Sequence, residues 1–509
     1  MRIYYDIMRQ LSYLTILAAT ILMTACGSVT VPDNYSKSDS LPKIYPDYVN
    51  VTVPYNIAPL TFELDEEADN MIVRYSFGDQ EILCEEKAQP AMDEWHQLTA
   101  KAKGKAIKVE VFEQKNDQWT LMKPFSINVS PDPIDPYISY RLISPSYVTY
   151  EELSINQRCL ENYDESVIYS NMLCSTEKDG QCINCHNYQQ YNPDRMLFHA
   201  RQNLGGTVIA YDGEIQKIDM KNDSIISAGV YPTWHPTMKY IVFSTNKTGQ
   251  SFHTRDLNKI EVFDAMSDLI AYDLENNTVT NIENRPDEFE VYPFWAPDGK
   301  TLYFCSAHFE YNDSIGSKDA DVIFHAKEVR YNIYKKSFDP KTKTFGERET
   351  VFVADTLGKS ATLPRISPDG RYLMFTLGAY GCFHIWHHDA DLYLMDLQTG
   401  DVRAMDEINS DDTESYHSWS SNGRWVIFSS RRDDGGYTRP FMAHIDKNGV
   451  GSKPFELPSA DPDYHRLFMK SYNIPEFMKG PVKISPQTFA SKLKKQGTPV
   501  TYVSTYCQP

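Results

Sequence analysis

The chain shows two distinct patterns of apolar and polar residues. Residues 46–130 hold short runs in which apolar and polar residues alternate with a period of two, and turns separate these runs. Such alternation is typical of antiparallel strands with one buried face. We therefore predict a β-sandwich of immunoglobulin or fibronectin type here, with Trp95 or Trp119 in its core.

The second pattern is a repeat within residues 195–480. Each copy has a turn, then an apolar run that fits a strand buried on both faces, then a second apolar strand. Asp-Gly or Asn-Gly, which favours a tight hairpin, occurs in three of the four turns. The four turns span residues 232–236, 293–299, 364–370 and 417–423. Repeats at this spacing predict the blades of a β-propeller.

These turns resemble those of TolB-like propellers, whose WD-like blades carry Trp-Ser-Pro-Asp-Gly. The resemblance covers roughly residues 195–475, and with further strands at either end we expect six blades, with five or seven as alternatives. The copies depart from the motif in several places, and in the first copy Thr237-Met238 replaces Asp-Gly. His235 and Ala296 replace Ser in the first two copies, and Ile366 replaces the aromatic residue in the third.

Residues 131–194 have mixed patterning and predict a connector that carries a Cys-x-x-Cys-His motif. This is the pattern of c-type haem attachment, in which two thiols bind the porphyrin and the following imidazole binds iron. We predict one covalent haem c held by Cys182 and Cys185, with His186 as the proximal iron ligand. Met196 or His199 is the candidate distal ligand. A disulfide or redox-active pair and half of a zinc site are the alternatives.

Residues 1–26 predict a signal peptide, because Arg2 and Arg9 precede a short apolar run. The run ends at Cys26 in a segment that resembles the lipobox of bacterial lipoproteins. That resemblance implies acyl chains on Cys26, which would hold the protein on a membrane, and Gly27 favours the outer membrane. Residues 27–45 are polar and predict a flexible tether.

Charge and the remaining motifs narrow the functional classes. A net charge of −19 argues against nucleic acid as a partner. No Gly-x-Ser-x-Gly or His-Glu-x-x-His occurs. Cys159 and Cys174 are close enough in sequence to pair, and residues 431–434, Arg-Arg-Asp-Asp, predict a solvated hairpin. Residues 481–509 predict a C-terminal tail.

Together these features predict an all-β, lipid-anchored, c-type cytochrome-like propeller in the cell envelope. Its expected role is electron transfer or redox sensing with an envelope protein as partner. The alternative is a non-catalytic propeller scaffold that binds a protein or glycan. If the protein is an enzyme, a haem-dependent peroxidase-type activity is the form we expect.

Overall fold

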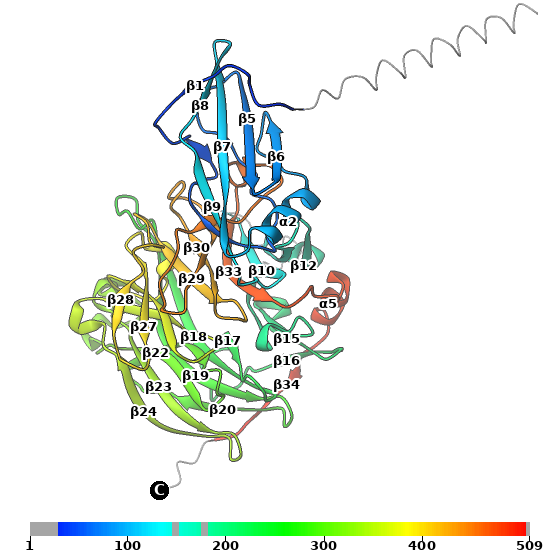
Figure 1. Cartoon of the computed structure of the whole chain (residues 1–509). Helices are drawn as coiled ribbons and strands as arrows, with labels where there is room; N and C mark the ends of the chain where they lie inside the picture. The colour runs from blue at the N-terminus through cyan, green and yellow to red at the C-terminus, as the bar shows by residue number, and fades with distance from the viewer. Residues whose placement is uncertain (1–28, 145–151, 175–181, 505–509) are drawn as a thin grey trace, which may run out of the picture.

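The computed structural model describes residues 29–144, 152–174 and 182–504. Cys26, and with it the predicted lipid anchor, lies outside these residues. Strands make up 47% of the structure and helices 11%, so the chain is mostly β as predicted. Figure 1 shows a small N-terminal domain, coloured blue to cyan, at one end of a larger body of sheets. No helix within the described ranges is long and apolar enough to cross a membrane.

The N-terminal domain contains one seven-stranded sheet rather than two facing sheets of similar size. Its long strand β7 pairs with β5 on one edge and with both β8 and β9 on the other. The sheet comprises β1 (Ser36–Lys37), β3 (Thr52–Pro54), β5 (Asn70–Phe77), β6 (Gln80–Glu85), β7 (Lys105–Lys115), β8 (Gln118–Leu121) and β9 (Phe125–Ser130), and β2 (Ile44–Tyr45) pairs separately with β4 (Glu63–Leu64).

A helix that the alternating pattern did not predict completes this domain. Helix α2 (Met92–Lys101) buries Trp95 against Tyr75, with ring centroids 5.7 Å apart. The indole N–H of Trp95 donates to the carbonyl of Ile57 at 3.0 Å. Trp95 therefore fills the core, as predicted, but it does so from a helix.

The larger body consists of six antiparallel units, each with one inner strand followed outward by three more. Unit 1 has β33 (Ser471–Met478), β10 (Tyr137–Ile143), β11 (Ser154–Cys159) and β12 (Glu165–Ser170); unit 2 has β13 (Ile183–Tyr188), β14 (Arg195–Ala200), β15 (Gly206–Tyr211) and β16 (Glu214–Asp219); unit 3 has β17 (Val230–Trp234), β18 (Tyr240–Phe252), β19 (Ile260–Asp273) and β20 (Thr278–Glu283).

The other three units follow in chain order. Unit 4 has β21 (Glu288–Trp295), β22 (Thr301–His308), β23 (Asn332–Asp339) and β24 (Thr344–Phe352); unit 5 has β25 (Ser360–Ile366), β26 (Tyr372–Gly378), β27 (Asp391–Asp396) and β28 (Val402–Ala404); unit 6 has β29 (Glu414–Trp419), β30 (Trp425–Ser430), β31 (Arg439–His444) and β32 (Phe455–Glu456). A single bridge between Ser267 and Phe289 joins units 3 and 4.

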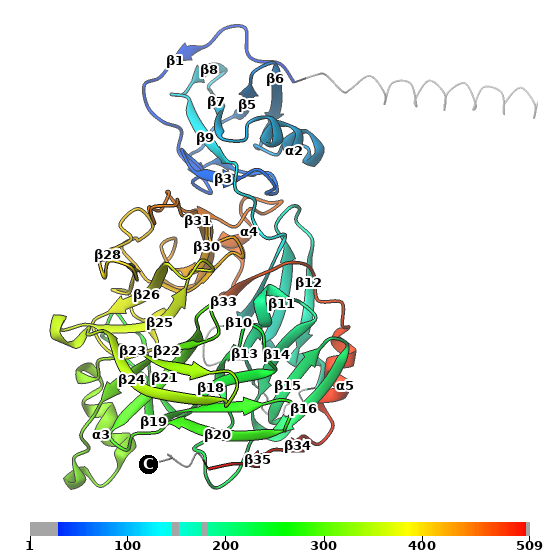
Figure 2. The same ribbon diagram turned by 60° about the horizontal axis from the view of Figure 1, so that its bottom comes forward.

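The six inner strands form a closed ring. Each contacts the next in the order β13, β17, β21, β25, β29, β33, and β33 also contacts β13. Figure 2 shows β33, from the end of the chain, lying beside β10. The prediction of a connector over residues 131–194 was therefore wrong. These residues supply three strands of unit 1 and the inner strand of unit 2, since β33 completes a sheet that begins before the repeats.

Every inner strand carries one residue with positive φ at a register shift against its partner. These residues, with φ between 47° and 54°, are Cys185, Tyr231, Tyr292, Leu363, Tyr416 and Ile474. A bulge of this kind re-aims the side chain of the bulged residue. All six side chains line a single narrow passage at the centre of the ring, which we call the waist.

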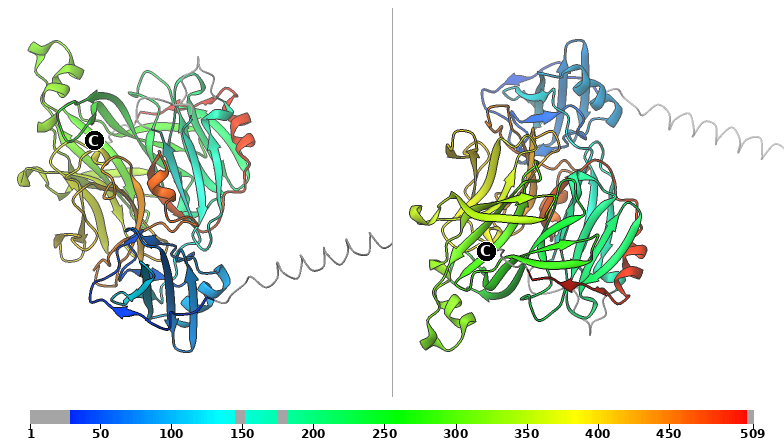
Figure 3. Two further views of the ribbon diagram at one scale, coloured as in Figure 1. Left: turned by 90° about the horizontal axis from the view of Figure 1, so that it is seen from above. Right: turned by 90° about the horizontal axis from the view of Figure 1, so that it is seen from below.

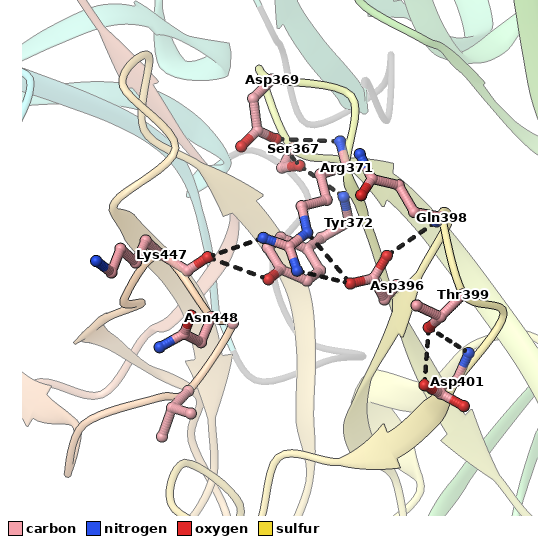
Figure 4. A network of polar contacts seen from close by, with 12 residues as sticks. Ser367, Asp369, Arg371, Tyr372, Asp396, Gln398, Thr399, Asp401, Lys447 and Asn448 are labelled. Atoms are coloured by element: carbon pink, nitrogen blue, oxygen red, sulfur yellow. Dashed lines mark hydrogen bonds and ion pairs between the residues drawn. The ribbon is translucent and has the colours of Figure 1, made fainter.

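The Ser-Pro-Asp-Gly turn of unit 5 shows what the repeated motif does (Figure 4). The Ser367 hydroxyl donates to Asp369 at 2.6 Å, and Asp369 accepts the backbone N–H of Arg371 at 3.1 Å. The Arg371 side chain then donates to Asp396 in its own unit and to the carbonyl of Lys447 in unit 6. The motif thus closes a turn and links neighbouring units.

In the first copy, His235 replaces Ser and makes the hydrogen bonds that close the turn and link two units. Its Nδ1 accepts the backbone N–H groups of Thr237 and Met238 at 3.2 and 3.0 Å. Its Nε2, the protonated nitrogen in that arrangement, donates to the carbonyl of Gly299 in unit 4 at 2.8 Å. A Cβ at Gly299 would lie 2.8 Å from this imidazole, so the close approach requires glycine.

The C-terminal region is ordered well past residue 481, where a tail was predicted. Helix α5 (Pro486–Leu493) buries Phe489 and Leu493 against units 1 and 2 (Figure 3). Beyond it, β34 (Thr498–Pro499) pairs with β16, and β35 (Thr501–Tyr502) pairs with β20. Two shorter helices, α3 (Lys318–Phe324) and α4 (Tyr464–Leu467), lie in loops.

Candidate ligand site at the wide mouth of the channel

The Cys-x-x-Cys-His motif lies in an inner strand of the ring, not in a loop. Cys185 and His186 occupy the bulge of β13. The corresponding pairs in the other inner strands are Tyr231-Pro232, Tyr292-Pro293, Leu363-Pro364, Tyr416-His417 and Ile474-Pro475. Cys-His therefore stands where four of the other five units have proline as the second residue, and unit 6 shares the histidine. The pattern His-Asn-Tyr at residues 186–188, matched to Pro-Thr-Trp at 232–234, is the signal that could have identified this repeat.

His186 is packed between units rather than presented to a cofactor. The side chain is 2% exposed and lies against Tyr188, with ring centroids 6.0 Å apart. Burial, with the nearby charge of Arg141, lowers the pKa of His186 to about 3, so the imidazole is neutral. His417 at the same position of unit 6 is equally buried, and its pKa is also lowered to about 3.

The space around the motif does not fit a covalent haem. The waist beside Cys185 and His186 has a volume of about 20 Å³, which is room for about one water molecule. Cys182 lines a different cavity, at one end of the waist. The two cysteines that would anchor one porphyrin thus line different cavities, neither of which is lined by both, and we derive no chemistry from haem.

The candidate distal ligands lie elsewhere. Met196 is fully buried in a cluster with Phe198 and Phe489, formed by units 1 and 2 and helix α5. His199 contacts the hydroxyl of Thr207 through Nδ1 at 3.1 Å, and burial lowers its pKa to about 3. Neither Met196 nor His199 is among the described residues that line the waist. His186 and these two residues are therefore not brought together.

The alternatives for the cysteines also find no support in the geometry. Cys182 and Cys185 are free thiols, as are Cys159 and Cys174. Burial raises the pKa of Cys185, which disfavours the thiolate that redox exchange needs. Within the described part of the chain, no group of three or more His, Cys, Asp or Glu could hold a metal ion.

A cavity of about 330 Å³ opens at one end of the waist, and we call it the wide mouth. Cys182 and Asn184, which precede the bulge of β13, lie in its wall. Three arginines also line it: Arg141 from β10, Arg201 after β14 and Arg431 after β30. No described Asp or Glu lines this cavity. In a chain of net charge −19, such a local excess of positive charge is unusual.

Arg141 is held in place by neutral groups. Its guanidinium donates to the carbonyl of Ile183 at 3.0 Å, to Asn184, and to Asn473 at 3.0 Å. These bonds tie β10 to the inner strands β13 and β33. Because none of the acceptors is charged, the positive charge of Arg141 is oriented but not neutralised.

Arg201 and Arg431 have no carboxylate within 4 Å among the residues that the structure describes. The Arg431 guanidinium lies over Trp386, 4.8 Å from the ring centroid, and its Nε has no hydrogen-bond partner there. Burial lowers the pKa of Arg431, and the more distant charges of Asp412 and Asp434 oppose that shift. The sequence analysis placed Arg431 in a solvated hairpin; it is instead largely buried beside an aromatic ring.

A second cavity of about 790 Å³ adjoins the first on its outer side. Both are bounded by Ile143, Ser144, Trp386, Arg431 and Ser471. We call the 330 Å³ part the inner lobe and the 790 Å³ part the outer lobe. The outer lobe adds Lys259, His253, Phe252 and Tyr437, and its described lining also lacks Asp and Glu.

The opposite end of the waist, the narrow mouth, has a volume of about 100 Å³. Its wall is formed by residues three positions after each bulge: Tyr188, Trp234, Trp295, Ile366, Trp419 and Phe477. Glu476 lies among them and accepts a hydrogen bond from Asn187 at 2.7 Å. Burial raises the pKa of Glu476 to about 7, against the opposing charge of Arg365.

No protein-family model and no curated protein matches the chain. Among solved structures, a luciferin-regenerating enzyme is 12% identical over 62% of this chain and 90% of its own, with a TM-score of 0.35. A periplasmic gluconolactonase of Pseudomonas aeruginosa is 11% identical over 63% and 96%, with a TM-score of 0.32. An oligogalacturonate lyase in complex with manganese is 12% identical over 80% and 99%, also with a TM-score of 0.32. At these identities and TM-scores the matches support no conclusion about this chain.

Proposed function

We propose that the six units are the blades of a six-bladed, TolB-like propeller, and that its wide mouth binds an acidic sugar. The ring of inner strands and the Ser-Pro-Asp-Gly turn support the first part. The single observation that carries the second is the cluster of Arg141, Arg201 and Arg431 in a cavity without a described carboxylate. This function corresponds to the alternative that the sequence left open, a non-catalytic propeller scaffold, with a glycan as its partner.

An anionic ligand explains why Arg201 and Arg431 have no carboxylate partner among the described residues, and why the acceptors of Arg141 are all neutral. Removing a guanidinium from water without a counter-charge costs free energy. This cost persists until a bound anion supplies the counter-charge. Carboxylates match the guanidinium fork with two parallel hydrogen bonds. Arg201 and Arg431 have donors that no described residue uses, so they are the groups that we expect to meet the anion.

The rest of the lining favours a ligand rich in hydroxyl groups. Neutral side chains that can both donate and accept hydrogen bonds surround the arginines: Asn184, Thr248, Gln250, Thr438, Ser471 and Asn473. Tyr231, Tyr416 and Trp386 add flat apolar faces. A cavity with aromatic walls and a few placed polar groups is the usual form of a small-molecule site. An acid sugar presents carboxylate, hydroxyls and ring faces together.

The inner lobe is equipped for binding rather than for acid–base chemistry. Its described lining includes no Asp, Glu, His or Lys. Burial raises the pKa of Tyr231 and of Tyr416 well above neutrality. A general acid or base works best with a pKa near the working pH, and no lining group whose pKa shift is resolved meets that condition.

Calorimetric titration with a hexuronic acid tests this proposal, with the neutral hexose and inorganic phosphate as comparison probes. We expect the uronate to bind and the hexose to bind at least tenfold more weakly, because it lacks the charge-assisted bonds. Arg201→Ala should lower uronate affinity about tenfold or more. Arg424→Ala, outside the cavity, is the control and should not. Equal affinity for uronate and hexose would contradict the proposal.

Of the two sequence predictions about attached groups, lipid anchoring stays a proposal and covalent haem does not. Anchoring through Cys26 in the outer membrane is tested by Cys26→Ser, which should release the protein from membranes. Covalent haem at Cys182 and Cys185 we no longer propose, because their surroundings do not fit it. Mass spectrometry of protein made with a cytochrome c maturation system should give the mass of the chain without porphyrin.

A further inference from the structure

We infer that the ligand of the wide mouth is a linear acidic oligosaccharide of at least two sugar units. Its terminal unit lies in the inner lobe and the chain continues outward through the outer lobe. This inference rests on the proposed function and goes beyond it by naming the length and direction of the ligand.

The two lobes adjoin. They share Trp386, Arg431 and Ser471 in their walls, so a ligand that leaves the inner lobe past these residues enters the outer lobe. A monosaccharide that filled the inner lobe would leave the larger outer lobe empty. The waist closes the other end of the inner lobe, since its volume is only about 20 Å³. A ligand longer than one unit can therefore extend only outward.

The outer lobe repeats the chemistry of the inner one. Lys259 supplies a cation on an exposed side chain, while Phe252 and Tyr437 supply aromatic faces. Gly435 and Gly436 add exposed backbone to the wall of the outer lobe. The nearest carboxylate of this loop, Asp434, is turned toward the backbone N–H groups of Gly436 and Tyr437. It does not line the lobe.

Arg431 lies at the border and lines both lobes. Its guanidinium lies over Trp386, 4.8 Å from the ring centroid, and this contact helps to hold it in place. It can therefore bind either of two successive carboxylates without a change in its own packing. A repeating acidic unit, with one carboxylate per sugar, fits cations placed along the cavity in the order Arg201, Arg431 and Lys259.

Chain-length dependence is the test, measured by calorimetry on the full chain. We compare a hexuronic acid, the uronate trisaccharide, the neutral trisaccharide of the same linkage, and a tetraglutamate peptide. The trisaccharide should bind about tenfold more tightly than the monomer, because it adds a charge-assisted contact in the outer lobe. Tetraglutamate and the neutral trisaccharide should bind more weakly than the uronate trisaccharide.

Two exposed lysines make a matched pair of variants. Lys259→Ala should remove most of the gain from chain length and leave monomer affinity unchanged. Lys221→Ala, on an exposed lysine that lines neither lobe, should change neither affinity. If the monomer binds but the trisaccharide binds no more tightly than the monomer, the inference is overturned and the proposed function stands. Tighter binding of tetraglutamate would overturn it in favour of an acidic protein segment. If neither uronate binds, both fail.

Discussion

The two mouths of the channel are built on the same six inner strands, yet they differ in chemistry. Residues three positions after each bulge form the narrow mouth, where five of the six are aromatic: Tyr188, Trp234, Trp295, Trp419 and Phe477. The arginines of the wide mouth come from outside the inner strands. The aromatic lining of the narrow mouth thus recurs from unit to unit, whereas the arginines of the wide mouth do not recur. Residues that do not follow the repeat are the better candidates for function, because loops on a rigid scaffold carry most binding groups.

The largest effect expected from this comparison is on stability. Trp295→Ala, at the narrow mouth, should lower the free energy of unfolding by about 3–5 kcal/mol, since the ring is buried against His235 and Phe338. Trp386→Ala, the matched change at the wide mouth, removes a half-buried ring and should cost less. Denaturant unfolding measures both. Equal losses would show that the two aromatic residues have the same structural role.

The next effect is a pH dependence confined to the narrow mouth. The pKa of Glu476 is raised from 4.5 to about 7, so the folded state favours the protonated carboxyl. Below pH 4.5 the group is protonated in both states. Stability then falls as pH rises to 7, by up to about 3 kcal/mol, and is constant above. Glu476→Gln should remove this fall in unfolding experiments at pH 5 and pH 8. An unchanged pH profile would contradict the assigned pKa.

At the wide mouth the expected change is in affinity alone. Arg431→Ala should weaken uronate binding by about ten- to a hundredfold, because it removes a charge-assisted pair and the stacked ring contact. Arg431→Lys keeps the charge but loses the planar fork, so it should recover only part of the affinity. A full recovery by lysine would indicate that charge alone, not geometry, selects the ligand.

The smallest effect concerns the links between units at the narrow end. Arg371→Ala removes bonds to Asp396 and to the carbonyl of Lys447. The Arg371 side chain is 37% exposed, so we expect a smaller loss of stability than for either tryptophan. Uronate affinity should be unaffected. A loss of several kcal/mol would mean that this network, rather than inner-strand packing, holds the units together.

The repeats were predictable because their turns and apolar strands are local in sequence. Unit 1 was not, since β33 pairs with β10 from the far end of the chain. The outer strands of unit 2 were predicted, but its inner strand β13 was hidden, because Cys185-His186 has the spacing of a haem motif. Helix α2 lacked an apolar stripe strong enough to predict it. No spacing rule relates Arg141, Arg201 and Arg431, because only the ring brings them together.

A crystal structure of the protein with the uronate trisaccharide bound tests the central claim most directly. We predict the terminal carboxylate within hydrogen-bond distance of Arg201 or Arg431, and a second sugar unit in the outer lobe beside Lys259. A trisaccharide bound at the narrow mouth, or with its carboxylates turned away from all three wide-mouth arginines, would contradict the account.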